Sequence, residues 1–182
     1  MAKTKLSACN EELELGPGIA VFAESDRGCV LVAHSQIEGY IGSLIRQYFK
    51  RVSGESGKIA DALLGSAKHS GQMAPLGNFS SRIKLARALG IVSRERYETL
   101  LSINALRVHC AHFPRQVLLS PQRVKAIAAK LEHSEQQKVK EAELRFGEMM
   151  SDGFKHSPAR IMFVCIVGNI TDDLIGLLDT TH

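Results

Sequence analysis

The chain has 182 residues, of which 45% are hydrophobic and 23% charged, values typical of a single globular domain. It contains no tryptophan and only ten other aromatic residues (seven Phe and three Tyr), so a core is expected to be built from Leu, Ile, Val and Ala. The formal net charge of +4 comes from basic residues interleaved with acidic ones, which argues against a surface dedicated to nucleic-acid phosphates.

The N-terminal residues 1–17 are interpreted as a tail, because they contain no apolar stretch of the signal-peptide type. The longest apolar run, 161–167, is too short to span a bilayer. The four cysteines, at positions 9, 29, 110 and 165, form no close pair and show no zinc-ligand spacing. We therefore expect a cytoplasmic protein with reduced thiols, no membrane association, no metal and no cofactor.

The first strong helical pattern covers residues 18–51. Side chains that recur every three or four residues predict one buried helical face. They are Val30, His34, Ile37, Ile41, Leu44, Ile45 and Tyr48. A short helix is expected over residues 58–67, and the stretch 68–78, with Pro75 and Gly77, is expected to be a loop.

Three helices are predicted in the middle of the chain. The first begins near Phe79 and stops at Gly90; the second is capped by Ser93 and ends before residue 114. Ser120 followed by proline opens the third, which is expected to reach about residue 131. Residues 134–150 are predicted to form a polar, peripheral helix, in which Ser134 and residue 137 have the spacing of a capping box.

The last segment begins at Ser157, and its residues 161–170 are rich enough in β-branched side chains to suggest a strand. A buried helix is favoured, because the Ser-Pro start and the continued spacing of Ile170, Leu174 and Leu178 are helical. The sequence thus predicts an all-α fold. We expect a compact bundle of about six to seven helices around one long N-terminal helix, in a single domain over residues 18–182.

The stretch 86–101 has the outline of a helix-turn-helix, with Ala86 followed by the turn residue Gly90. Such a motif needs an apolar residue facing inward about six positions after the glycine, where this chain has Arg96. Glu95 and Glu98 would also repel phosphates. A plain helical corner is the better interpretation, and Arg94 and Arg96 are weak candidates for direct contacts to DNA.

Arg107 and His112 have the Arg-x4-His spacing that marks HEPN-type ribonucleases, in which a cation would stabilise the phosphate and an imidazole would move protons. On an ideal helix the two side chains lie about 140° apart. Val108 also occupies a position that is usually polar in those nucleases. A structural role or a dimer contact is favoured, and a metal-independent ribonuclease is the alternative. His109 and His112 lack a third ligand, so no metal site is predicted.

Three blocks together resemble the mannitol operon repressor family. They are Glu-Ser-Asp-Arg-Gly at 24–28, Ala-Pro-Leu-Gly-Asn-Phe-Ser-Ser-Arg-Ile-Lys-Leu-Ala at 74–86 with Leu-Gly-Ile at 89–91, and the segment from Arg107 to His112. Their order and separations are similar to the family's across roughly residues 19–131. The family usually has Arg-Asn-x-Phe-Ala-His in the third block, where this chain has Val108 and Cys110.

The resemblance implies an all-helical fold and a role in negative regulation of genes for sugar-alcohol uptake, without an ordinary DNA-reading module. It also implies a protein that acts through a partner. A regulatory interaction protein of this kind is expected to be a homo-oligomer, and no enzymatic activity is predicted because the residues suggest no convincing catalytic site. The candidate partner or dimer contacts are Arg27, Phe79, Arg82, Arg107 and His112. A ribonuclease using Arg107 and His112, and a repressor that binds DNA directly, are the alternatives.

Overall fold

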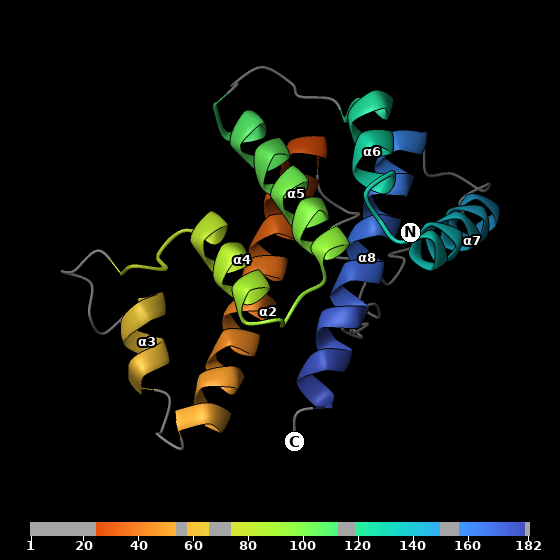
Figure 1. Ribbon diagram of the computed structural model, residues 1–182. Helices are drawn as coiled ribbons and strands as arrows, with labels where there is room; N and C mark the ends of the chain where they lie inside the picture. The colour runs from red at the N-terminus through yellow and green to blue at the C-terminus, as the bar shows by residue number, and fades with distance from the viewer. Residues whose placement is uncertain (1–24, 54–57, 66–73, 113–118, 150–156, 181–182) are drawn as a thin grey trace, which may run out of the picture.

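The computed structural model describes residues 25–53, 58–65, 74–112, 119–149 and 157–180. In these residues it has seven α-helices and no β-strand, which confirms the all-α prediction. Figure 1 shows the helices packed into one bundle in which the long helix α2 is central. They are α2 (Asp26–Ser53), α3 (Lys58–Leu64), α4 (Phe79–Ala88), α5 (Arg94–His112), α6 (Pro121–Ala128), α7 (His133–Met149) and α8 (Pro158–Asp179).

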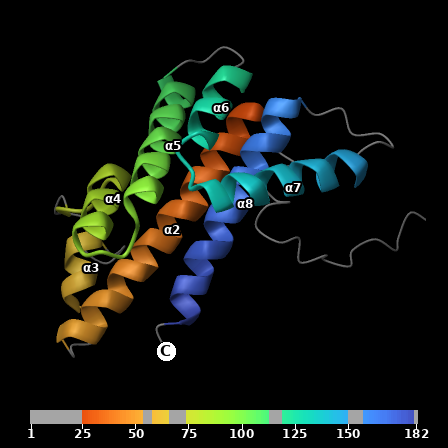
Figure 2. The same ribbon diagram turned by 45° about the vertical axis from the view of Figure 1, so that its right-hand side comes forward.

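The long helices α2 and α8 run parallel through the middle of the bundle (Figures 1 and 2). Near their first turns, Arg160 Nε donates to Asp26 Oδ1 at 2.7 Å. Near their last turns, Gln47 Nε2 donates to the carbonyl oxygen of Leu178 at 3.4 Å. Their facing sides supply much of the aliphatic core that the composition predicts, including Val30, Ile37, Ile41, Ile45, Phe163, Ile166, Ile170 and Leu174.

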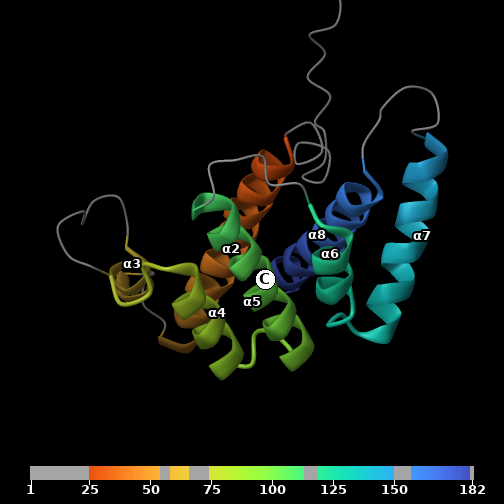
Figure 3. The same cartoon turned by 90° about the horizontal axis from the view of Figure 1, so that it is seen from above.

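Helices α4 and α5 pack on one side of α2, with α3 against its second half, while α6 and α7 lie against α8. Seen from above in Figure 3, α7 is the outermost helix on its side. Its contacts are mainly with α8, as expected for the peripheral polar helix that the sequence predicts. The bundle therefore has two sides, joined by the pairing of α2 with α8.

The helical interpretation of the last segment is confirmed by α8. The Ser157 side chain accepts a hydrogen bond from the backbone N–H of Arg160 at 3.2 Å, and Pro158 occupies the first turn. By length and apolar composition alone, α8 is the one helix in the described part of the chain that could cross a membrane. Ten of its residues are buried in this bundle, eight of them apolar, as in a core helix.

Several predicted helix ends are corrected by the structure. Helix α2 is described from Asp26, and the predicted start at residue 18 lies outside the described residues. Helix α3 ends at Leu64 rather than near residue 67, because Gly65 adopts a positive φ of 77°, which breaks the helical path. Helix α6 ends at Ala128, three residues before the predicted end.

The predicted capping box at Ser134 is wrong. Helix α7 begins at His133, so Ser134 is already inside its first turn. The side chain that reaches back is Glu135, whose Oε2 accepts from the backbone N–H of Glu132 at 3.0 Å. The other oxygen of this carboxylate, Oε1, pairs with Arg96 of α5.

Gly90 lies in the corner between α4 and α5, and its backbone adopts the left-handed conformation with a φ of 71°. Replacing it with alanine is expected to lower the free energy of unfolding by about 1 kcal/mol, because a Cβ there is strained by the backbone conformation. Gly39 is the matched control, since it is an exposed helical position with open space around a new Cβ. Alanine at Gly39 is expected to stabilise by about 0.5–1 kcal/mol in chemical denaturation. Equal effects at the two positions would contradict the role of the positive φ.

Candidate functional site

The block 74–86, the most specific part of the family resemblance, builds the junction between α3 and α4. Leu76 N–H donates to the carbonyl oxygen of Leu63 at 2.9 Å, which ties the loop to α3. Asn78 then caps α4, because its side-chain oxygen accepts from the backbone N–H of Ser81 at 2.8 Å. These residues hold the fold together at this corner.

Phe79 was predicted to contact a partner, and the structure corrects this. Its side chain is only 4% exposed and lies in the core, where it packs against α2. The Phe79 and His34 rings pack edge to face, with centroids 4.5 Å apart at an interplanar angle of 71°. Phe79 is thus a packing residue of the monomer.

Arg82 is also used inside the chain rather than on a partner surface. Its Nε donates to the carbonyl oxygen of Leu76 at 2.8 Å, and its Nη2 donates to that of Leu64 at 3.1 Å. Its Nη1 lies 3.2 Å from the Glu38 carboxylate on α2. One guanidinium therefore fastens α3, the following loop, α4 and α2 to each other.

His34 lies on the apolar face of α2, buried as a hydrogen-bonded core residue. Its Nε2 is 3.2 Å from the side-chain oxygen of Asn104 on α5, and its Nδ1 is 3.9 Å from the Glu38 carboxylate. Burial lowers the pKa of His34 below its ordinary value of 6.5, more than Asn104 and Glu38 raise it, and the charge of Arg107 lowers it further. The neutral imidazole is therefore the form that the fold favours.

This lowered pKa predicts a pH dependence of stability. Below pH 6.5 the unfolded chain binds a proton at His34 more readily than the folded chain, so stability is lost as the pH falls from neutral. In His34→Gln that contribution is absent. We expect the fall in unfolding free energy between about pH 8 and pH 5 to be smaller in the variant than in the original chain, by urea denaturation at each pH. Parallel pH profiles would contradict the prediction.

The structure does not support Arg96 as a contact to DNA. Arg96 is 8% exposed, and its Nη2 pairs with Glu135 of α7 and with Asp173 of α8. Arg94 is exposed and lies 3.2 Å from Glu98, one turn along the same helix. Of the two candidate DNA contacts, Arg96 is therefore buried and Arg94 is paired with Glu98 on the surface.

The other predicted contact residues lie near one end of the bundle, where α2 begins and α5 ends (Figure 1). Arg27 and Arg107 are half-buried, and His112 is exposed at the last residue of α5. Arg107 lies close enough to His34 to influence its pKa. Arg107 is thus half-buried near α2, whereas His112 is exposed at the end of α5.

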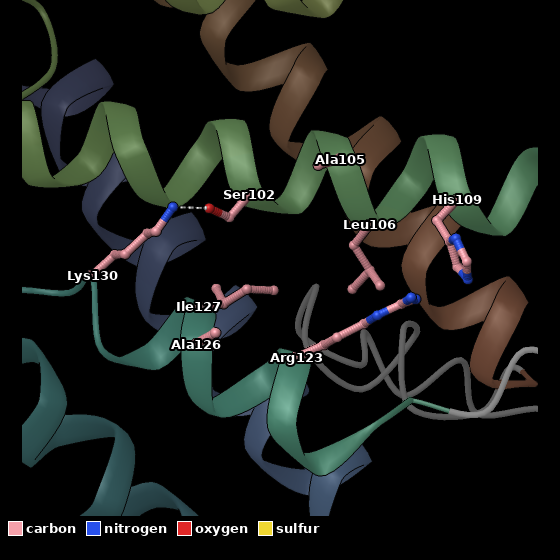
Figure 4. A pocket seen from close by; sticks show the side chains of 8 residues that line it. All are labelled: Ser102, Ala105, Leu106, His109, Arg123, Ala126, Ile127 and Lys130. Carbon is pink, nitrogen blue, oxygen red and sulfur yellow. Dashed lines mark hydrogen bonds between the residues drawn. The ribbon is translucent and has the colours of Figure 1, made fainter.

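A cleft between α5 and α6 combines basic, hydroxyl and apolar side chains. It has a volume of about 370 Å³, and we refer to it as the α5–α6 groove. Its lining residues are Ser102, Ala105, Leu106, His109, Arg123, Ala126, Ile127 and Lys130. Figure 4 shows Lys130 beside Ser102 at one end of the groove and Arg123 with His109 toward the other.

The charges of the groove have one sign. Arg123 is in the first turn of α6, and Lys130 is in the turn that follows this helix. The Lys130 ammonium donates to the Ser102 hydroxyl at 2.7 Å, which directs it across the groove toward α5. None of the eight lining residues, all of them in the described part of the chain, is acidic. Leu106 and Ile127 lie between the charged ends, so the floor is apolar (Figure 4).

The described cysteines offer no activated nucleophile. Cys29, Cys110 and Cys165 are buried. Burial raises the pKa of Cys110, and it raises the pKa of Cys165 to about 11. A thiol with a raised pKa is mostly protonated at neutral pH, and a protonated thiol is a poor nucleophile. Among the described residues, no three His, Cys, Asp or Glu side chains are grouped as metal ligands would be.

The groove was not predicted from the sequence. Arg123 and Lys130 flank Ile127 at helical spacing, a signal visible in the chain. However, that spacing alone is also typical of an ordinary amphipathic helix. The partner wall on α5, including His109, becomes visible only when α5 and α6 pack together.

Comparison of the chain with protein-family models, with curated proteins and with solved structures found no match.

Proposed function

We propose that this protein is a bacterial transcriptional regulator of the mannitol operon repressor type, which acts by binding another protein rather than by reading DNA with its own helix. The three sequence blocks support the family. The pairing of the exposed Arg94 with Glu98 supports the second part, because carboxylates at the start of a recognition helix would repel DNA phosphates.

The observation that carries the proposal is the α5–α6 groove. An apolar floor between cationic ends is suited to a partner segment that brings both apolar side chains and carboxylates. Arg123 and Lys130 are exposed, so they can meet such a segment without unfolding the domain. Enzymatic function has weaker support, since Arg107 and His112 have different surroundings and the described thiols are buried.

The proposal is tested in the source bacterium. Deleting the gene is expected to raise transcription of a sugar-alcohol uptake operon, measured by sequencing total RNA with and without the sugar alcohol. The original gene should restore repression, whereas the double variant Arg123→Ala, Lys130→Ala should not. Lys125→Ala is the matched control, because Lys125 is an exposed cation of α6 outside the groove.

Repression restored equally by the double variant and by Lys125→Ala would show that the groove is not the functional surface. Unchanged transcription of every sugar-alcohol operon in the deletion strain would remove the regulatory proposal itself.

A further inference from the structure

The α5–α6 groove has a shape and a charge pattern that specify its occupant more narrowly. From these we propose that it binds an amphipathic, acidic helix of the partner protein, with two carboxylates about two helical turns apart and apolar side chains between them. This inference rests on the proposed function, since it names the kind of partner that the regulator would take.

The spacing of the two cations sets the spacing of the carboxylates. Arg123 and Lys130 are seven residues apart along α6 and the turn that continues it. This corresponds to about two helical turns, or roughly 10 Å along the axis. A helix lying along α6 would present acidic side chains at positions i and i+7 to the two cations. Those positions are on one face of a helix, so one alignment of the partner helix along α6 would bring a carboxylate to each cation.

The floor accounts for the apolar part of the partner. Ala105 and Ala126 are small residues on opposite walls, and Leu106 and Ile127 supply apolar surface. A volume of about 370 Å³ is enough for a few side chains and too small for a whole helix. The partner would therefore insert apolar residues at i+3 and i+4, between its two carboxylates, as helices bound in apolar grooves do.

The same features disfavour a nucleic acid as the occupant. Binding a phosphate backbone generally uses many cations in a row and aromatic side chains that stack on bases. The lining of this groove has two permanently charged cations, no Phe or Tyr, and an apolar floor that would leave phosphates without partners. An acidic helix satisfies both the charged ends and the floor.

The test uses the full chain and a designed helical peptide with Glu at i and i+7 and Leu at i+3 and i+4, carrying a fluorophore. Fluorescence anisotropy is expected to show saturable binding that weakens between about 50 and 200 mM salt. Arg123→Ala with Lys130→Ala should reduce the affinity at least about tenfold, and Lys125→Ala should leave it unchanged. A peptide with Lys at i and i+7 should not bind.

A second variant tests access to the apolar part of the groove independently of charge. Ala126 is exposed, and Ala126→Phe would fill the groove while keeping both cations. It is expected to abolish peptide binding while its thermal unfolding stays close to that of the original chain. Peptide binding that survives both Ala126→Phe and the double variant would overturn the inference.

Two other occupants are distinguished by the same proteins. If a labelled oligonucleotide binds in place of the peptide and the double variant abolishes that binding, the acidic-helix inference is wrong. If the chain is an oligomer in analytical ultracentrifugation and the double variant dissociates it, the groove is occupied by a second copy and the inference is also wrong. If the peptide does not bind, but the double variant still fails to restore repression in the cell, this inference is wrong and the proposed function is retained.

Discussion

Replacing Arg96 with alanine is expected to lower the free energy of unfolding by about 3–5 kcal/mol, because it removes one partner from a buried charge cluster. The Arg96 side chain is 9% exposed and that of Glu135 is 10% exposed, so water replaces the lost guanidinium poorly. Asp173, whose side chain is 40% exposed, can be rehydrated. The cost therefore comes mainly from Glu135.

The pH dependence of this effect identifies its cause. Burial already raises the pKa of Glu135 above its ordinary value of 4.5, and the charge of Arg96 opposes that rise. Without Arg96 the pKa should rise further, so the folded variant would favour the protonated acid. A carboxyl whose pKa is higher in the folded than in the unfolded chain stabilises the fold at pH values below the unfolded pKa. This contribution is lost as the pH rises. The loss of stability in Arg96→Ala should thus be largest near pH 7 and shrink toward about pH 4.

Urea denaturation at several pH values measures both the loss of unfolding free energy in Arg96→Ala and its pH dependence. Arg94→Ala is the control. Arg94 forms an exposed ion pair with Glu98, one helical turn away, so its removal should cost at most about 1 kcal/mol. A similar small loss in Arg96→Ala, independent of pH, would mean that the cluster contributes little to joining α5, α7 and α8.

Asp26→Ala is expected to have a comparable effect at the other end of the bundle, again about 3–5 kcal/mol. The Asp26 carboxylate accepts from Arg160 Nε at 2.7 Å and from the backbone N–H of Leu119 at 2.8 Å. The side chains of Asp26 and Arg160 are 14% and 10% exposed. Its loss would remove a charge partner from a buried guanidinium and an acceptor from a buried backbone donor.

Two further variants separate the causes. Asp26→Asn keeps an oxygen acceptor but no charge, so it should be less destabilised than Asp26→Ala. Asp61→Ala removes one member of the exposed pair Arg46–Asp61, whose side chains are 44% and 47% exposed, and should cost at most about 1 kcal/mol. If thermal unfolding shows the same small loss of stability in Asp26→Ala as in Asp61→Ala, the bonds from Asp26 to Arg160 and Leu119 are not determinants of stability.

Asp26 also connects stability to the candidate function. Leu119 is two residues before α6, and α6 forms one wall of the groove. The hydrogen bond from Leu119 to Asp26 therefore holds the start of that wall against α2 and α8. Partner binding by Asp26→Asn should weaken less than by the groove variants, because the cations themselves remain.

The family-like blocks have mainly architectural roles in this bundle. Asp26 joins three segments, Asn78 caps α4, and Arg82 fastens α3 and α4 to α2. Residues with such roles would be shared by proteins of one fold whatever their partners. The groove residues Arg123 and Lys130 are where specificity for a partner is expected.

The sequence by itself determined the helical architecture. Apolar spacing predicted the buried face of α2, and the Ser157-Pro158 start predicted α8 as a helix, because both signals depend only on neighbours within a few residues. The position of Arg96 could likewise be recognised as one that faces inward after the Gly90 turn.

Only the tertiary structure decided what those positions do. The partners of Arg96 lie 39 and 77 residues further along the chain, and those of Asp26 lie 93 and 134 residues away. The groove likewise needs α5 and α6 to pack before its one-signed charge and apolar floor exist. Periodicity indicates which side of a helix is buried, but the charge that meets a side chain is set by distant segments, and no local pattern encodes that pairing.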